Sequence, residues 1–209
     1  MKMTVAQAMV KCLEQEQIQT VFGYPGAAIC PFYDALLNSP IEHLLIRQEQ
    51  MGGHCANGLA RVTGRPQVCI ATSGPGALNL ITGIATAYMD SIPLVCITGQ
   101  VNSDQLGKDV FQEADITGAV EPFSKYSYIV KDGSQIARIF KEAFYLAGTG
   151  RPGPVVIDVP TDIQNQTIDF EYPETISMRS YKPTVVGNAR QITRAAAALK
   201  KSKRPLIVA

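Results

Sequence analysis

Short apolar runs that alternate with helix-like stretches constrain the fold of this chain more strongly than any other feature. The runs are mostly apolar on both faces, and they cover residues 20–22, 44–46, 68–71, 94–98, 126–130 and 154–159. Strands of this kind belong to parallel sheets, which helices cover on both sides. We therefore expect an α/β fold, a parallel β-sheet flanked by helices on both faces.

The stretches between these runs carry apolar residues at helical spacing. We expect helices over residues 1–17, 29–37, 49–64, 77–89 and 134–146. In the fourth of these helices the residues that should share the buried face are Leu78, Ile81, Ile84 and Ala85.

The C-terminal part of the chain differs from the rest. Periodicity is lost after residue 163, and Pro173 and Pro183 follow, so we expect one domain over residues 1–165 and a linker over residues 166–187. Asn188 should cap a helix over residues 189–201, and the apolar residues 204–209 predict the start of a strand. Residues 188–209 thus indicate the start of a second α/β domain, truncated in a fragment of a longer polypeptide.

The composition excludes several classes of protein. Hydrophobic residues make up 46% of the chain and charged residues 18%, with a net charge of +1 and no basic stripe, which argues against a disordered chain and against a nucleic-acid partner. The charged N-terminus is not a signal peptide, and no apolar run approaches the roughly 18 residues of a membrane span. Five scattered cysteines indicate a reducing compartment, so we expect a cytoplasmic protein. His43 and His54 lack partners at metal-ligand spacing, and we predict no metal site.

Glu49 is the strongest candidate for chemistry. It stands where the run at residues 44–46 becomes a helix, and ligands of parallel sheets collect at the carboxyl ends of strands. The alternative is that Glu49 only favours the dipole of its helix as a first-turn acid. Glycine-containing turns at residues 23–26, 52–53 and 74–76 suit a cofactor lying over the strand ends. The turn at residues 73–76 lacks the features of a phosphate loop, so a flat, neutral heterocycle is the better ligand for it.

Five segments carry a resemblance to a known family. They are VFGYPGA at 21–27, RQEQ at 47–50, ATSGPGALNLITGIATAYMDSIPLVCITGQV at 71–101, DVFQEADI at 109–116 and GRPGPVVIDVPTDIQ at 150–164. In this order the chain resembles the N-terminal, pyrimidine-binding region of acetolactate synthase (acetohydroxyacid synthase) large subunits. The resemblance implies a thiamine-diphosphate enzyme that decarboxylates pyruvate and joins the hydroxyethyl unit to a second 2-oxo acid, in branched-chain amino acid biosynthesis.

The resemblance also assigns roles to single residues. The counterpart of Glu49 hydrogen-bonds a ring nitrogen of the cofactor's aminopyrimidine, and burial beside Leu45 and Ile46 would help it to hold a proton. Gln112 and Gly26 are implied on the catalytic side with Glu49. The residues implied to contact cofactors are Tyr24, Pro25, Pro75, Asn79 and Phe111 for thiamine diphosphate and Arg151 for FAD. As alternatives, Asn79 is an ordinary first-turn polar residue, and Arg151 caps the C-terminus of the helix before it.

This chain departs from the family pattern at Ala27, Gln48, Asn102, Lys108 and Thr161. These departures put the second substrate and the dependence on FAD in doubt. The resemblance further implies that a separate C-terminal domain, not present in this sequence, holds the diphosphate and Mg²⁺, so that the fragment alone is inactive. It implies a homodimer or homotetramer with a small regulatory subunit. The alternatives are another thiamine-diphosphate carboligase, decarboxylase or oxidase, and a non-catalytic binding module with the same fold.

Overall fold

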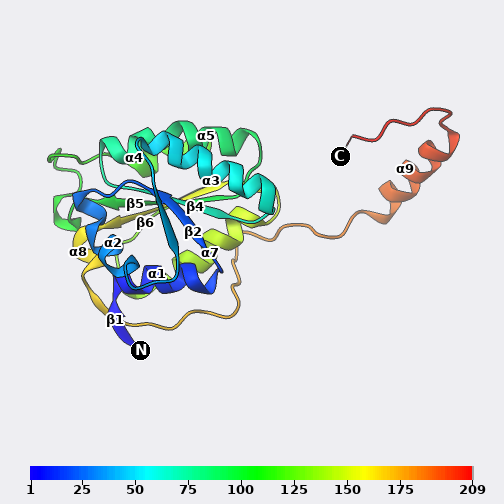
Figure 1. The fold of residues 1–209 in the computed structure, drawn as a ribbon. Coiled ribbons are helices and arrows are strands. Elements are labelled where there is room, and N and C mark those ends of the chain that lie inside the picture. The colour runs from blue at the N-terminus through cyan, green and yellow to red at the C-terminus, as the bar shows by residue number, and fades with distance from the viewer. Residues whose placement is uncertain (209) are drawn as a thin grey trace. The chain divides into compact units, whose positions relative to one another are not determined.

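The structure is a computed structural model that describes residues 1–208 (Figure 1). The chain divides into two compact units, Met1–Ser177 and Met178–Ala209. The first unit contains every residue that the sequence assigns to a site. The boundaries expected at residues 165 and 187 stay a prediction.

A six-stranded parallel sheet forms the centre of the first unit, in the order β3-β2-β4-β5-β7-β6. Its strands are β2 (Thr20–Gly23), β3 (Glu42–Leu45), β4 (Gln67–Ala71), β5 (Leu94–Gln100), β6 (Tyr126–Ile129) and β7 (Pro154–Pro160). All residues of β4, β5 and β7 are buried, because these strands lie in the middle of the sheet under helices on both faces. The predicted parallel α/β fold is confirmed.

Helices cover both faces of this sheet (Figure 1). One face carries α3 (Glu49–Thr63), α4 (Pro75–Asn79) and α5 (Ile81–Met89), while the other carries α1 (Val5–Gln15), α2 (Cys30–Leu36) and α7 (Ile136–Gly148). The shorter helical segments are η1 (Ala27–Ile29), η2 (Ser103–Gln105), α6 (Ile116–Val120), η3 (Glu121–Phe123), η4 (Gly133–Gln135) and α8 (Thr161–Gln164). Helix α3 ends where Gly64 adopts φ +67°, as the sequence predicts for a glycine C-cap.

Strand β3 is not the buried strand that the sequence suggests. The side chains of Leu44 and Leu45 are 42% and 65% exposed, and only Ile46, just after the strand, is buried. The reason is its position, because β3 lies at the edge of the sheet and pairs only with β2. Apolar residues in an edge strand cannot be distinguished by composition from those of a central strand.

The helix predicted over residues 77–89 is two helices, α4 and α5, which meet at Leu80. The amide of Leu80 donates to the carbonyl oxygen of Ala77 (3.1 Å), a tighter turn than an α-helix makes. The tighter turn changes the buried face, so Leu78 is 43% exposed. Ile84 is buried as predicted, Ile81 and Ala85 are half-buried, and the other buried residues of the two helices include Ala77, Leu80 and Ala87.

A second, two-stranded sheet was not predicted. Strand β1 (Lys2–Thr4) pairs antiparallel with β8 (Thr167–Asp169), which lies inside the expected linker. The predicted N-terminal helix therefore begins only at Val5, after Thr4, whose side chain accepts a hydrogen bond from the amide of Gln7 in a capping box.

The second unit contains α9 (Ala189–Lys201), with the bounds that the sequence predicts. The side-chain oxygen of Asn188 accepts a hydrogen bond from the amide of Gln191 (3.1 Å), which confirms the predicted cap. Over residues 202–208 the structure assigns no strand, so the strand predicted there is wrong for the part that is described.

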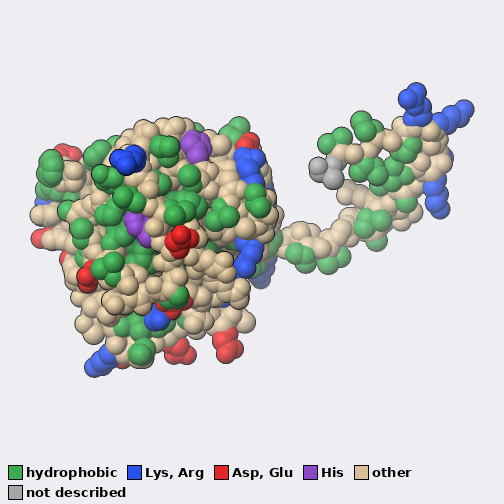
Figure 2. Space-filling view, in the orientation of Figure 1, with side chains coloured by type: hydrophobic (Ala, Val, Ile, Leu, Met, Phe, Trp, Pro, Cys, Tyr) green, Lys and Arg blue, Asp and Glu red, His purple; other side chains and the backbone are tan. Residues whose placement is uncertain are grey.

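Two properties of the described residues bear on partners. On the face of the first unit drawn in Figure 2, acidic and basic side chains are interspersed, without a large patch of one sign. Within residues 1–208 no helix combines the length and the apolar character that crossing a membrane requires.

Candidate functional site

Glu49 is the first residue of α3 and follows the carboxyl end of β3. Its side chain is half-buried, and its Oε2 accepts a hydrogen bond from Nδ2 of Asn79 at 3.0 Å. Asn79 is the last residue of α4, so this bond joins the start of one helix to the end of another. The carboxylate of Glu49 also lies at the positive end of the α3 dipole, so both interpretations of this residue fit its position.

Thr72 lies near Glu49, and the backbones of two glycines pack against its side chain. A Cβ added to Gly26 would lie 2.5 Å from Cβ of Thr72, and one added to Gly76 would lie 2.8 Å from its Cγ2 and 3.3 Å from Oε1 of Glu49. Real Cβ atoms do not approach other atoms at the first two distances, so both positions require glycine. The hydroxyl of Thr72 is buried and has no hydrogen-bond partner among the described residues.

Gln112 reaches the same place from a distant part of the chain. Gly74 has φ +59°, and a Cβ on it would lie 2.6 Å from the carbonyl oxygen of Gln112. Gln112 itself has φ +59°, a conformation that non-glycine residues rarely adopt. The backbone of Gln112 therefore packs against the turn that precedes α4. This contact brings Gln112 to the same edge of the sheet as Glu49.

Several predicted contact residues surround this space but are exposed. Tyr24 and Pro25 follow β2, Pro75 begins α4, and Phe111 precedes Gln112. The Phe111 side chain is 87% exposed, and its contact with the cofactor stays a prediction. Together, these residues form an open rim, which leaves access for a ligand or for another protein surface.

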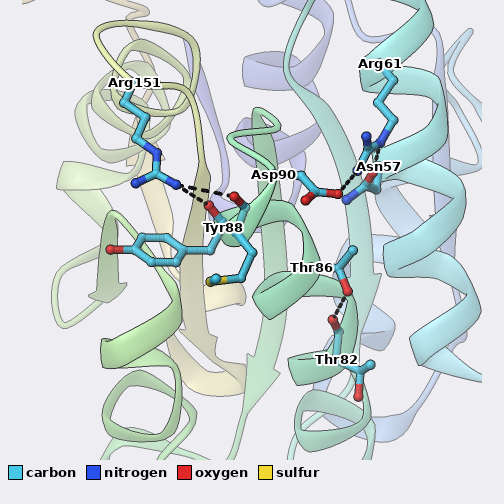
Figure 3. A network of polar contacts seen from close by, with 8 residues as sticks. Asn57, Arg61, Thr82, Thr86, Tyr88, Asp90 and Arg151 are labelled. Carbon is cyan, nitrogen blue, oxygen red and sulfur yellow. Dashed lines mark hydrogen bonds and ion pairs between the residues drawn. The ribbon is translucent and has the colours of Figure 1, made fainter.

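Arg151 lies at the opposite edge of the sheet from Glu49. It precedes β7, and in a parallel sheet the strand starts lie together at one edge and the strand ends at the other. Nη2 of Arg151 donates to the carbonyl oxygens of Tyr88 (3.3 Å) and Met89 (3.4 Å) (Figure 3). Nε of Arg151 donates to Oγ of Ser91 (2.8 Å). Arg151 thus caps the C-terminus of α5, and the alternative that it caps the helix before it, α7, is wrong.

The same end of α5 is tied to α3 (Figure 3). Arg61 forms an ion pair with Asp90, and its Nε donates to Oδ1 of Asn57 at 2.7 Å. This pair is exposed, so it adds little stability. The two helices are in close contact where Gly83 meets Gly53. The opposite end of α3 carries Glu49, and α4, which leads into α5, carries Asn79. The packing of α3 against α5 therefore also positions the site.

The sequence analysis missed a buried polar group beneath the loop that carries Gln112. Asp158 of β7 is 1% exposed, and it accepts hydrogen bonds from the hydroxyl of Thr98 (2.6 Å) and from Nε2 of Gln100 (2.9 Å). Burial raises the pKa of the Asp158 carboxyl to about 7, although the two hydrogen bonds lower it. The sequence does show polar residues inside two apolar strands, Thr98 and Gln100 in β5 and Asp158 in β7, and this pattern could have revealed the group.

The described residues hold no cluster that could bind a metal ion. Within residues 1–208, no three side chains of His, Cys, Asp or Glu come together as ligands. Nε2 of His43 lies 3.1 Å from the carbonyl oxygen of Gly23, and its ring packs against Tyr33, which places His43 inside the fold.

Comparison with known proteins agrees with this geometry. The chain is 49% identical over 207 residues to the acetolactate synthase large subunit of Corynebacterium glutamicum, covering 99% of this chain and 33% of that protein. It is 51% identical over 207 residues to the acetolactate synthase large subunit of Buchnera aphidicola subsp. Schizaphis graminum, covering 98% of this chain and 36% of that protein. It is 49% identical over 205 residues to the acetolactate synthase isozyme 3 large subunit of Escherichia coli, covering 97% and 36%.

The chain therefore spans about a third of the length of the relatives it matches. Residues 3–119 match the family described as thiamine pyrophosphate enzyme, N-terminal TPP binding domain. That segment runs from β1 through α6 and includes Glu49, Thr72, Asn79 and Gln112. The match covers more than half of the chain, and the chain belongs to this family of N-terminal domains of thiamine pyrophosphate enzymes.

Proposed function

We propose that this chain is the pyrimidine-binding part of an acetolactate synthase that decarboxylates pyruvate and joins the resulting two-carbon unit to a second 2-oxo acid. The observation that carries the proposal is the hydrogen bond between Glu49 and Asn79, beside two closely packed glycine turns at the carboxyl ends of the strands. The near-complete coverage of this chain by large subunits of that enzyme supports the same activity for the whole protein.

The residues at this site fit the pyrimidine ring of thiamine diphosphate. Gly26 and Gly76 pack against Thr72, and the absence of a Cβ at Gly76 lets a flat ring approach Oε1 of Glu49 on that side. Oε1 of Glu49 offers a hydrogen-bonding group to ring nitrogens and amino groups, and the hydroxyl of Thr72, buried and without a partner among the described residues, becomes a second one in this proposal when the ring binds. When bound, the cofactor supplies the carbon nucleophile and electron sink that decarboxylation of a 2-oxo acid requires.

Glu49 has the central role in this proposal. Its carboxyl group holds or shares a proton with a ring nitrogen, and the bond from Asn79 fixes which oxygen remains for that contact. Because Asn79 donates to Oε2, Oε1 is the oxygen that faces Gly76 and the site. Gln112 approaches the same edge from the other side, where the reacting substrate would lie.

We also propose the remaining cofactors and partners. Mg²⁺ and the diphosphate are held by another domain, and Arg151 contacts FAD at the opposite edge of the sheet, while its present contacts keep it at the end of α5. The whole protein works in the cytoplasm as a homodimer or homotetramer with a small regulatory subunit. The support for the last point is that the relatives are themselves named as large subunits.

The test is acetolactate formation from pyruvate by the full-length protein with thiamine diphosphate and Mg²⁺, with and without FAD. We expect Glu49→Gln to lower the rate at least about 100-fold, the usual minimum for loss of acid–base catalysis. Glu42→Gln is the matched control, because Glu42 is an exposed acid on β3 and should leave the rate unchanged. An unchanged rate in Glu49→Gln would refute the role of Glu49. Product formation only from other 2-oxo acids would indicate a different carboligase.

A further inference from the structure

The loop that carries Gln112 spans residues 101–115 and is called here the Gln112 loop. It contains one short helical turn, η2, and none of its residues is buried. Without a hydrophobic core of its own, the loop depends on hydrogen bonds for its conformation. The polar groups that anchor it therefore decide where Gln112 lies.

Gln100 anchors both ends of the Gln112 loop. It is the last residue of β5, and its side chain is buried. Oε1 of Gln100 accepts a hydrogen bond from the amide of Val101 (2.9 Å), the first residue of the loop. Nε2 of Gln100 donates to the carbonyl oxygen of Ala114 (2.9 Å), next to the last residue. The side-chain amide of Gln100 thus connects the start of the loop to Ala114, which lies 14 residues after Gln100 in the sequence.

Asp158 fixes the orientation of this amide. The second hydrogen of Nε2 of Gln100 donates to Oδ2 of Asp158 (2.9 Å), and Thr98 donates to Oδ1 (2.6 Å). The backbone amide of Val101 can only donate and the carbonyl oxygen of Ala114 can only accept, so the oxygen of Gln100 must face Val101 and its NH₂ group must face Ala114 and Asp158. Every hydrogen-bonding group of the Gln100 amide is then satisfied by a specific partner.

Two further carboxylates accept hydrogen bonds from backbone amides of the Gln112 loop, one from α8 and one from the loop itself. Asp162 accepts a hydrogen bond from the amide of Ser103 (2.8 Å). Glu113 accepts from the amides of Gly107 and Val110, and the bond from Gly107 contributes most to lowering the pKa of Glu113. These contacts shape the interior of the loop. Among the hydrogen bonds of residues 1–208, those of the Gln100 side chain are the ones that link both ends of the loop to β5.

We propose that Gln100 and Asp158 are positioning residues that hold Gln112 in the site, which extends the function proposed above. Ala114, the residue that Gln100 binds, is two residues from Gln112, whose backbone packs against Gly74 in a strained conformation. Loss of the anchor lets the end of the loop move, and the strain at Gln112 favours that movement. Gln100 and Asp158 touch none of Glu49, Thr72 or Asn79 by hydrogen bonds, so binding of the pyrimidine ring should not depend on them.

The experiment uses Gln100→Leu and Asp158→Asn in the full-length protein. Leu removes all the hydrogen bonds of the Gln100 side chain at similar volume, while Asn at position 158 turns an NH₂ group toward Gln100 or Thr98, both of which donate. We expect faster hydrogen exchange of residues 101–115 in both variants. We expect kcat/KM for pyruvate to fall roughly 10- to 100-fold, the cost of misplacing a group near the reaction, with the Kd for thiamine diphosphate changed less than about twofold.

Gln164→Leu is the matched control. Gln164 is also a fully buried glutamine, and its Nε2 donates to the carbonyl oxygens of Ala28 (2.7 Å) and Val159 (2.9 Å), neither of which belongs to the loop. It should cost stability as Gln100→Leu does but leave exchange of residues 101–115 at the wild-type rate.

Four outcomes separate the alternatives. Wild-type exchange of the loop in Gln100→Leu would overturn the proposal, and so would equal exchange in Gln100→Leu and Gln164→Leu. A loss of cofactor affinity as large as the loss of kcat/KM would show a general structural role and would also overturn it. If the wild-type protein forms no acetolactate while the exchange result is as expected, the anchor of the loop is supported and the proposed function fails on its own.

Discussion

At the scale of the residue, the carboxyl group of Asp158 is the most unusual feature of the first unit. It lies in the middle of the sheet on β7, with β5 on one side and β6 on the other. Desolvation disfavours its charge, two hydrogen bonds favour it, and Asp115 opposes it, and the balance places its pKa at about 7. In the unfolded chain the same group would titrate near 3.8. Between these two values, folding takes up a proton.

This balance predicts how stability depends on pH. From about pH 4 to about pH 7 the folded state holds a proton that the unfolded state has released, so the contribution of Asp158 to the free energy of unfolding falls as the pH rises. Asp158→Asn cannot titrate and should lack this slope. We expect the difference between wild type and variant, from urea unfolding at pH 4.5 to 8, to change by a few kcal/mol at most over this window. A flat difference would show that Asp158 has an ordinary pKa.

Thr72 gives a prediction with opposite signs for two measurements. Its buried hydroxyl has no partner among the described residues, and such a group costs about 1–3 kcal/mol. Thr72→Val should therefore raise the melting temperature of the protein without cofactor. If the hydroxyl binds the pyrimidine ring, the same change should weaken thiamine diphosphate binding about 5- to 10-fold, as expected for one hydrogen bond. Lower stability without cofactor would contradict the first half, and unchanged affinity the second.

At the scale of the element, the six strands of the parallel sheet were predictable and the two strands of the small antiparallel sheet were not. β4, β5 and β7 consist mostly of apolar residues because helices cover both of their faces, and this pattern is visible in the sequence. β1 and β8 have three residues each and pair although they lie near opposite ends of the first unit in sequence, so no local sequence pattern predicts them. The break between α4 and α5 at Leu80 also escaped prediction, because no Gly or Pro stands at that position.

The candidate site was predictable only in part, for a similar reason. Glu49 could be placed because a strand runs directly into a helix there, and strand ends meet at one edge of a parallel sheet. Thr72, Gln100 and Asp158 matter through contacts made in three dimensions, and the sequence shows each only as a polar residue near the end of a strand. Arg151 stands in a glycine-containing turn, but this turn leads into the start of β7, so Arg151 lies at the end of the sheet opposite Glu49.

The crossing of α3 and α5 predicts opposite effects for two glycines. A Cβ on Gly83 would lie 2.9 Å from Cα of Gly53, so the two backbones are in contact there. Gly83→Ala should lower the free energy of unfolding by about 1–3 kcal/mol, because nothing in a backbone contact can move aside. Gly58→Ala, on the same α3, is the control, because a Cβ there meets nothing within 4 Å. It should stabilise the protein by about 0.5–1 kcal/mol. Equal effects of the two changes in denaturant unfolding would contradict the close packing.

At the scale of the whole molecule, hydrogen bonds hold the segment after β7 to the N-terminal part of the first unit. The amide of Phe170 donates to the carbonyl oxygen of Met1 (2.8 Å), which extends the pairing of β1 with β8. Tyr172 then donates its hydroxyl to Oε1 of Glu16 (2.6 Å). The chain is thus fastened to the N-terminal strand and to the end of α1. From Met178 to Asn188 the structure assigns no helix or strand.

This organisation predicts where trypsin cuts first in the 209-residue chain. Arg179 is exposed and lies outside any helix or strand, whereas Lys182 is followed by Pro183, which blocks cleavage. α9 has no buried residues, and an isolated helix of this length frays. We expect the earliest cuts after Arg179 or within α9, which leave a resistant fragment that contains the whole first unit. Mass spectrometry of the fragments identifies the sites.

The same digestion tests the order of the Gln112 loop. Lys108 is the exposed basic residue in that loop. The hydrogen bonds of Glu113 and Gln100 should prevent the backbone at Lys108 from entering the active site of the protease. Arg179→Gln should therefore move the first cut into α9 and not to Lys108. In Gln100→Leu, cleavage after Lys108 should become fast. Early cleavage at Lys108 in the wild-type chain would mean that the loop is already open, and Gln112 would then need another surface to hold it in the site.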